Sequence, residues 1–159
     1  MKKILIQTLI ISFFFISFNA TAEIKHIKDG NVDAKVKLVV FESLTCSHCG
    51  DFHRDIYPKL KTDFIDKNLI SIEYRNFPLD IAAFNAAKIA HCRNDGKSEI
   101  LHHLYNNQSS WVRGSTIEDL NKNLKKVVQE SGFKLDFDNC IANSKIEDFI
   151  LEDRIDGAK

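Results

Sequence analysis

The chain has 159 residues, and its 22 basic and 22 acidic side chains give a formal net charge of zero. This balance argues against a surface that binds nucleic acid or anionic lipid. Because 44% of the residues are hydrophobic and no repeat or low-complexity tract interrupts them, we expect a single folded domain with a sizeable core.

The N-terminus has the pattern of an export signal. Lys2 and Lys3 precede an apolar stretch at residues 4–18, and Ala20-Thr21-Ala22 is a small-residue cleavage pattern. The apolar stretch is shorter than the roughly 20 residues that a membrane-spanning helix needs. We therefore interpret residues 1–22 as a signal peptide, with an uncleaved membrane anchor as the alternative. An even number of cysteines in an exported chain favours disulfide chemistry, and all four lie beyond the signal: Cys46, Cys49, Cys92 and Cys140.

The first part of the mature chain predicts a β–α–β unit. A short edge strand is predicted at residues 24–27, a buried strand at 37–42 and a second strand at 69–77, where apolar residues alternate. Between the last two strands, helical spacing predicts a helix over residues 50–67, kinked at Pro58. We expect the two strands to be parallel. The predicted inward residues of this helix are Cys49, Phe52, Ile56, Leu60 and Phe64.

The remaining chain predicts helices at residues 81–94, 97–107, 115–132 and 135–143, and a last helix from residue 144. Two of them open on capping boxes, Ser115-x-x-Glu118 and Ser144-x-x-Glu147. A β–α–β unit followed by a block of helices predicts an α/β fold with a helical subdomain inserted after the second strand. The predicted inward residues of the block are Ala82, Ala86, Ile89, Leu101, Leu104, Tyr105, Ile117, Leu120, Leu124, Val127, Val128, Ile146, Phe149 and Ile150.

Cys46-Ser47-His48-Cys49 lies where the predicted strand gives way to the helix. Unpaired backbone N–H groups and the helix macrodipole favour a thiolate at such a position, and the thiolate is the form that attacks or leaves a disulfide. We predict Cys46 as the exposed nucleophile and Cys49 as the buried thiol that resolves a mixed disulfide. The alternatives are a purely structural disulfide or half of a zinc site. Zinc needs four ligands, and the remaining candidates do not have a standard ligand spacing, so no metal is predicted: His91, Cys92, His102 and His103.

Two neighbouring residues are candidates for supporting roles. A protonated His48 would lower the pKa of Cys46, although this residue is alternatively a surface histidine without a role. Glu42 lies four residues before Cys46 and is either a buried acid that helps proton transfer from Cys49 or a solvent-facing strand residue. The pair His102-His103 is predicted to lie on a helix surface. Four further residues are interpreted as core or groove formers: Phe77, Pro78, Leu79 and Trp111.

The segments at residues 41–53 and 74–79 resemble the active-site region of DsbA-like thiol–disulfide oxidoreductases. The helical block, with Cys92, Trp111, Cys140 and its closing residues 146–154, resembles the helical domain inserted in that family. The resemblance implies a thioredoxin-like domain at residues 23–159 with a helical insertion at about 80–155. It also favours Cys92–Cys140 as a structural disulfide, the alternative being two unrelated buried thiols.

The same resemblance implies a periplasmic protein-disulfide oxidoreductase. Such a protein donates its disulfide to reduced exported polypeptides, needs no bound cofactor and is re-oxidised by a quinone-linked membrane partner. The alternatives are a disulfide isomerase or reductase, and an inactive remnant or a metal- or peptide-binding module.

The chain departs from the family at its end. Family members continue into a strand that opens with a cis-proline, whereas the only prolines here are Pro58 and Pro78. We therefore interpret the sequence, which ends at Lys159, as a fragment or a truncated form without the C-terminal strands. An open sheet edge is then expected, and such an edge favours aggregation.

Overall fold

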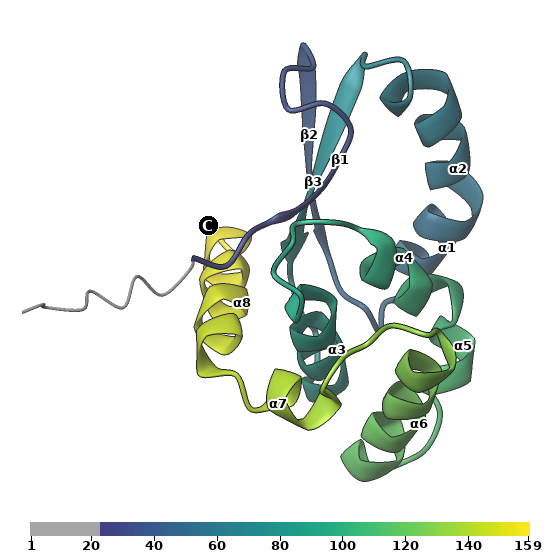
Figure 1. The fold of residues 1–159 in the computed structure, drawn as a ribbon, viewed down its shortest axis with the longest axis vertical. Helices are drawn as coiled ribbons and strands as arrows, with labels where there is room; N and C mark the ends of the chain where they lie inside the picture. The colour runs from purple at the N-terminus through teal and green to yellow at the C-terminus, as the bar shows by residue number, and fades with distance from the viewer. Residues whose placement is uncertain (1–22) are drawn as a thin grey trace, which may run out of the picture.

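The computed structural model describes residues 23–159, so the predicted signal peptide at residues 1–22 lies outside the described part. Figure 1 shows a small sheet at the top of the molecule, with α2 on its right. Helix α8 lies to the lower left, and the other helices of the C-terminal half lie below the sheet. No helix within residues 23–159 is long and apolar enough to cross a bilayer. The elements, with π-helical segments labelled η, are β1 (Ile27–Asp29), β2 (Val36–Glu42), α1 (Ser47–Asp51), η1 (Phe52–Ile56), α2 (Tyr57–Leu60), η2 (Lys61–Ile65), β3 (Ile70–Asn76), α3 (Ile81–His91), α4 (Glu99–Asn106), α5 (Gln108–Trp111), α6 (Ile117–Glu130), α7 (Phe137–Ile141) and α8 (Ser144–Asp156).

The sheet has the strand order β1-β3-β2. Strands β2 and β3 are parallel, with Glu42 opposite Asn76, so the predicted parallel β–α–β unit is confirmed. Strand β1 pairs antiparallel with the other edge of β3. It starts later than the predicted strand at residues 24–27, because its ladder with β3 runs from Ile27 to Asp29.

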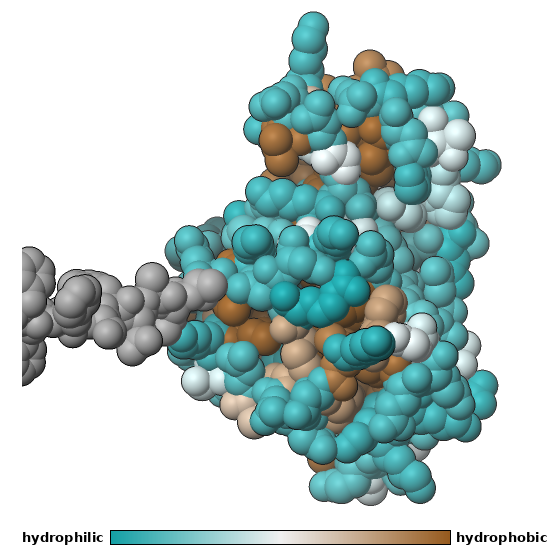
Figure 2. Space-filling view, viewed as in Figure 1, coloured by the Kyte–Doolittle hydropathy of each residue, from teal (hydrophilic) through white to brown (hydrophobic). Residues whose placement is uncertain are grey.

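The prediction that the first long strand is buried is wrong. Strand β2 forms an edge of the sheet, and Leu38, Val39 and Phe41 are 36%, 55% and 42% exposed. A continuous apolar run is typical of a parallel strand covered on both faces. Among the described residues, however, only β3 pairs with this strand. On the face drawn in Figure 2, the surface is mostly polar, with apolar areas at the upper end and within the helical half.

The helix after β2 is one continuous run that alternates between α and π winding. Pro58 stands at the start of α2, between two π segments, which places the irregular winding around the predicted kink. Each π turn is wider than an α turn and rotates the following residues around the axis. Two predicted inward residues, Ile56 and Phe64, are therefore 52% and 44% exposed, whereas His53 is buried.

Helices α3 to α8 bury most of the residues predicted to face inward, including Ala86, Leu104 and Ile150, each with no exposed surface. Both predicted capping boxes are wrong, because each helix is capped by the residue next to the predicted serine. The backbone is extended at Thr116 and at Asn143, so these residues, rather than Ser115 and Ser144, accept hydrogen bonds from the first helical turns. The short helix α5 was not predicted.

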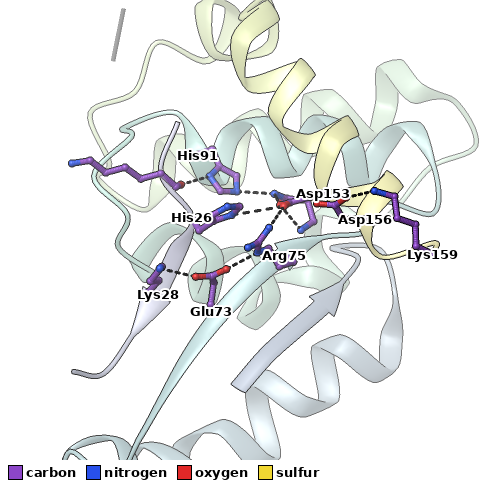
Figure 3. Close-up of polar contacts among 10 residues, drawn as sticks. His26, Lys28, Glu73, Arg75, His91, Asp153, Asp156 and Lys159 are labelled. Atoms are coloured by element: carbon purple, nitrogen blue, oxygen red, sulfur yellow. Dashed lines mark hydrogen bonds and ion pairs between the residues drawn. The ribbon is translucent and has the colours of Figure 1, made fainter. Parts of the chain in front are cut away.

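Two long-range links hold the helical block together. The sulfur atoms of Cys92 and Cys140 are joined, with their Cα atoms 5.4 Å apart, which ties the end of α3 to α7. Asp153 of α8 is 2% exposed and accepts hydrogen bonds from Arg75 and Asn76 of β3 (Figure 3). Helix α8 is thereby fastened to the central strand of the sheet.

Candidate active site

Cys46 is the N-cap residue of α1. Its backbone is extended, with φ of −72° and ψ of 121°, and its carbonyl accepts the first helical hydrogen bond from Gly50 at 3.1 Å. The backbone N–H of Cys49 lowers the pKa of the Cys46 thiol, and the Cys49 thiol and the His48 N–H contribute in the same direction. Burial opposes this change without reversing it. The beginning of the helix thus stabilises a thiolate at Cys46.

Cys49 lies one turn further along and has the opposite character. Both cysteines are half-buried, so the predicted contrast between an exposed Cys46 and a buried Cys49 is wrong. Burial nevertheless raises the pKa of the Cys49 thiol to about 11. The negative charges of Cys46 and Glu42 add to this increase. At neutral pH the pair therefore holds one sulfur suited to be a thiolate and one that keeps its proton unless a base removes it.

The loop that carries Cys46 is held by residues distant in sequence. Gln108 of α5 donates from Nε2 to the carbonyls of Leu44 and Cys46, both at 2.9 Å. A Cβ atom at Gly50 would lie 2.4 Å from Gln108 Oε1, so the position requires glycine while Gln108 keeps this place. Thr45 also donates to Asp80 at 2.7 Å. No local motif marks Gln108, and our sequence analysis missed it.

Glu42 is buried at the end of β2, so the solvent-facing alternative is wrong. It is 8% exposed, and burial raises its pKa to about 8. Its Oε2 lies 2.8 Å from His53 Nε2, while its Oε1 is buried without a hydrogen-bond partner. A carboxyl group in this environment holds its proton near neutral pH and is suited to exchange it.

His48 points away from the protein. Its side chain is 94% exposed, and its Nδ1 atom lies 3.8 Å from Asp51 Oδ2. The contact that the structure shows between His48 and Cys46 is through the backbone N–H rather than the ring.

The prediction that His102-His103 forms a helix surface is wrong for His102. Its Nδ1 lies 2.9 Å from His53 Nδ1, its Nε2 lies 2.9 Å from Asp29 Oδ2, and its ring stacks on Tyr57 at 4.0 Å. Burial lowers the pKa of His53 to about 3, so this ring is neutral. His103 is half-buried as well: it donates from Nε2 to the Val127 carbonyl at 3.2 Å and its ring lies edge-on to Phe133.

The residues considered as zinc ligands are engaged elsewhere. Cys92 is joined to Cys140, and His91 contacts Asn76 through Nε2 at 3.0 Å. Within residues 23–159, no group of three or more histidine, cysteine or acidic side chains is arranged to hold a metal ion.

A sheet flanked by helices, with a C-x-x-C pair at the beginning of the helix after β2, defines a thioredoxin-like protein. The sequence model of a family described as thioredoxin matches residues 22–159, and the chain belongs to this family. The predicted thioredoxin-like α/β fold is thereby confirmed.

Individual relatives fit the predicted resemblance to DsbA-like proteins. The crystal structure of alpha-DsbA1 from Wolbachia pipientis is similar to this chain, with 32% identity, a TM-score of 0.73 and coverage of 82% of this chain and 66% of that one. A Rickettsia bellii protein, provisionally named as a protein-disulfide oxidoreductase, is 30% identical over 77% of this chain and 47% of its own length. The disulfide bond formation protein D of Bacillus subtilis is 28% identical over 64% of this chain and 50% of its own. The chain spans about half the length of these curated relatives.

Proposed function

We propose that the protein is a thiol–disulfide oxidoreductase that donates the Cys46–Cys49 disulfide to reduced polypeptides. The observation that carries the proposal is the opposite shift of the two thiol pKa values, downward at Cys46 and upward at Cys49. A stabilised Cys46 thiolate favours the reduced protein, which makes the disulfide a good oxidant. The names of the similar proteins from Bacillus subtilis and Wolbachia pipientis support the same chemistry.

The reaction has two exchange steps. A substrate thiolate attacks Cys46 Sγ, the Cys46–Cys49 bond breaks, and Cys49 leaves as a thiolate that takes a proton from Glu42. The second substrate thiolate then attacks the substrate sulfur of the mixed disulfide, and Cys46 leaves as a thiolate. The substrate loses two electrons as its disulfide forms, and the protein dithiol gains them. No bound cofactor takes part.

The setting of this reaction is part of the proposal. Residues 1–22 direct export to the periplasm, and residues 23–159 form the thioredoxin-like domain with its helical insertion at about 80–155. Reduced exported polypeptides are the substrates, and a quinone-linked membrane protein is the re-oxidising partner. Cys92–Cys140 acts as a structural disulfide, and a cross-link that closes a loop of 48 residues contributes about 4 kcal/mol in the chain-entropy model.

The test mixes the oxidised protein with a reduced, unfolded peptide that contains two cysteines. We expect rapid formation of the peptide disulfide, loss of this reaction in Cys46→Ser, and a trapped mixed disulfide in Cys49→Ser. Circular dichroism checks that each variant is folded. Oxidation that survives in Cys46→Ser, or no oxidation by the folded wild-type protein, would contradict the proposal. A glutathione equilibrium in the range of reducing thioredoxins would instead favour the isomerase or reductase alternative.

Replacing His48 by alanine should make the pair more reducing. A protonated imidazole would add positive charge near Cys46 and favour its thiolate, so its removal would stabilise the disulfide relative to the dithiol. We expect the equilibrium constant with glutathione to change by about fivefold, because the ring is exposed and its charge is screened by water. His103→Ala is the control, and an equilibrium equal to that of wild type would remove His48 from the mechanism.

A further inference from the structure

A continuous row of hydrogen-bonded side chains leads from Glu42 away from the cysteines. Glu42 Oε2 lies 2.8 Å from His53 Nε2, the two histidine Nδ1 atoms lie 2.9 Å apart, and His102 Nε2 lies 2.9 Å from Asp29 Oδ2. The row connects β2, η1, α4 and β1. Both rings are held by stacking, His53 on Tyr105 at 3.9 Å and His102 on Tyr57 at 4.0 Å.

Exposure to solvent rises along this row. The side chains of Glu42 and His53 are 5% and 0% exposed, whereas those of His102 and Asp29 are 16% and 15% exposed. His102 and Asp29 line an open groove of about 690 Å³, and neither Cys46 nor Cys49 is among its lining residues. The row thus connects the buried acid near Cys49 to solvent in a groove that neither cysteine lines.

The hydrogen-bond directions allow two arrangements of the same number of protons. Burial opposes ionisation of Asp29, but hydrogen bonds from His102 and Ser98 outweigh it and lower its pKa to about 2, so its carboxylate accepts from His102 Nε2–H. In the first arrangement His102 is neutral, His53 donates from Nδ1 to His102, and the protonated Glu42 donates to His53 Nε2. In the second arrangement, the Glu42 proton has moved to His53 Nε2 and the His53 Nδ1 proton has moved to His102. This leaves a Glu42 carboxylate and a doubly protonated His102.

We propose that Glu42, His53, His102 and Asp29 form a proton relay that connects Cys49 to the groove that His102 and Asp29 line. The inference rests on the proposed dithiol chemistry and extends it to two histidines and an aspartate. Glu42 Oε1 and the Tyr105 hydroxyl are both buried without a hydrogen bond of good geometry, and the hydroxyl is near enough to lower the Glu42 pKa. The relay assigns proton exchange with Cys49 to Oε1, because Glu42 and Cys49 are close enough for the Glu42 charge to raise the Cys49 pKa. His53 and His102 act through Glu42 and are relay residues.

The relay operates when the reduced protein is re-oxidised. The Cys46 thiolate first attacks a disulfide reagent, which forms a mixed disulfide and releases one of the reagent's two sulfurs as a thiolate. Cys49 then loses its proton to Glu42 Oε1 while Glu42 gives up the proton on Oε2. Cys49 attacks Cys46 Sγ and expels the reagent's second sulfur as a thiolate, so the protein dithiol is oxidised and the reagent is reduced. The proton on Glu42 Oε2 passes to His53, that on His53 Nδ1 passes to His102, and His102 releases one through Asp29 to water.

An exit into a groove that neither cysteine lines keeps proton exchange open while a polypeptide covers Cys46. The charged side chains that line the groove are Lys28 and Asp29 on β1, Arg54 on η1, Lys61 on η2, Lys97 before α4 and Glu99 on α4. Four of these six are cationic.

The kinetic test compares His102→Gln with His103→Gln, which changes the adjacent residue of the same helix. The reduced protein is mixed with oxidised glutathione, and release of the first and second glutathione molecules is followed separately. Glutamine keeps a hydrogen-bonding side chain but does not relay a proton. We expect His102→Gln to slow only the second release, by about tenfold, below the effect of removing a general acid–base group itself. The pH dependence of that step should also change.

Equal rates and pH profiles in the two variants would overturn the relay, while Cys46-dependent oxidation by wild type would leave the proposed function intact. A second measurement needs no turnover and no variant. In the ¹⁵N-labelled wild-type protein, NMR should detect coupling through the hydrogen bond between the Nδ1 atoms of His53 and His102. Absence of this coupling in the folded protein would also overturn the relay.

Discussion

Replacing Asp153 by alanine should lower the free energy of unfolding by about 3–5 kcal/mol, the range for breaking a buried ion pair from one side. The carboxylate accepts from Arg75 Nη1 at 3.0 Å, and from the backbone N–H and side-chain amide of Asn76 at 3.0 Å and 2.7 Å. His26 Nδ1 lies 3.7 Å away. Alanine leaves all of these groups without their shared acceptor in a site that is 2% exposed.

Urea denaturation followed by circular dichroism measures this loss. Asp156→Ala is the matched control, since Asp156 lies on the same helix, is 55% exposed and contacts Lys159 only at the surface (Figure 3). We expect its effect to stay within about 0.5 kcal/mol. Similar losses in the two variants would show that α8 is not fastened to β3 through Asp153.

The local parts of this structure could be predicted from the sequence. The C-x-x-C pair and its parallel β–α–β unit depend on residues close together in the chain, and the alternation of Ile72 and Tyr74 marks β3. The face of the helix at residues 47–65 could not be predicted, because its π turns rotate His53 inward and Ile56 outward. Periodicity assumes regular α winding and cannot detect such a change.

The contacts that complete the site join distant segments. His53 and His102 are 49 residues apart, and Gln108 reaches Cys46 across 62. The sequence of a helix does not indicate whether a histidine on it faces solvent or another helix. For this reason the sequence analysis predicted the wrong environment for His102. Glu42 left two alternatives open for the same reason, since a residue at a strand end is buried only if other elements cover it. These assignments depend on tertiary packing and required the structure.

Replacing Glu42 by glutamine should slow the step in which Cys49 gains or loses its proton by about 10²-fold, as expected for loss of a general acid–base group. The amide occupies the same volume and donates to His53 Nε2 as the protonated acid does, so the fold should be kept. Release of the second glutathione molecule, as in the test of His102, measures this step. Glu130→Gln is the control, because Glu130 is 65% exposed and lies on α6 beside Lys126, away from the groove.

The same variant should remove a component of the pH dependence of stability. Burial raises the pKa of Glu42 to about 8, above the value of 4.5 for an exposed glutamate, so folding takes up a proton between these pH values. The free energy of unfolding therefore falls by about 1.4 kcal/mol per pH unit as the pH rises through this window. Buried histidines whose pKa is lowered, such as His53 and His91, contribute a slope of the opposite sign near pH 6.5. This contribution is common to wild type and variant, so the difference between the two proteins isolates Glu42.

Denaturation of wild type and Glu42→Gln at several values between pH 6.5 and 8 isolates this component. We expect wild type to lose stability relative to the variant across the range, so that the variant becomes the more stable protein toward pH 8. If Glu42→Gln reacts slowly but is more stable than wild type, Glu42 is needed for the reaction rather than for stability. The neutral amide of glutamine would then fit the same buried site at a lower cost in free energy of unfolding. A variant with the wild-type slope would show that Glu42 is already ionised in the folded protein, and the first proton arrangement of the relay would then be wrong.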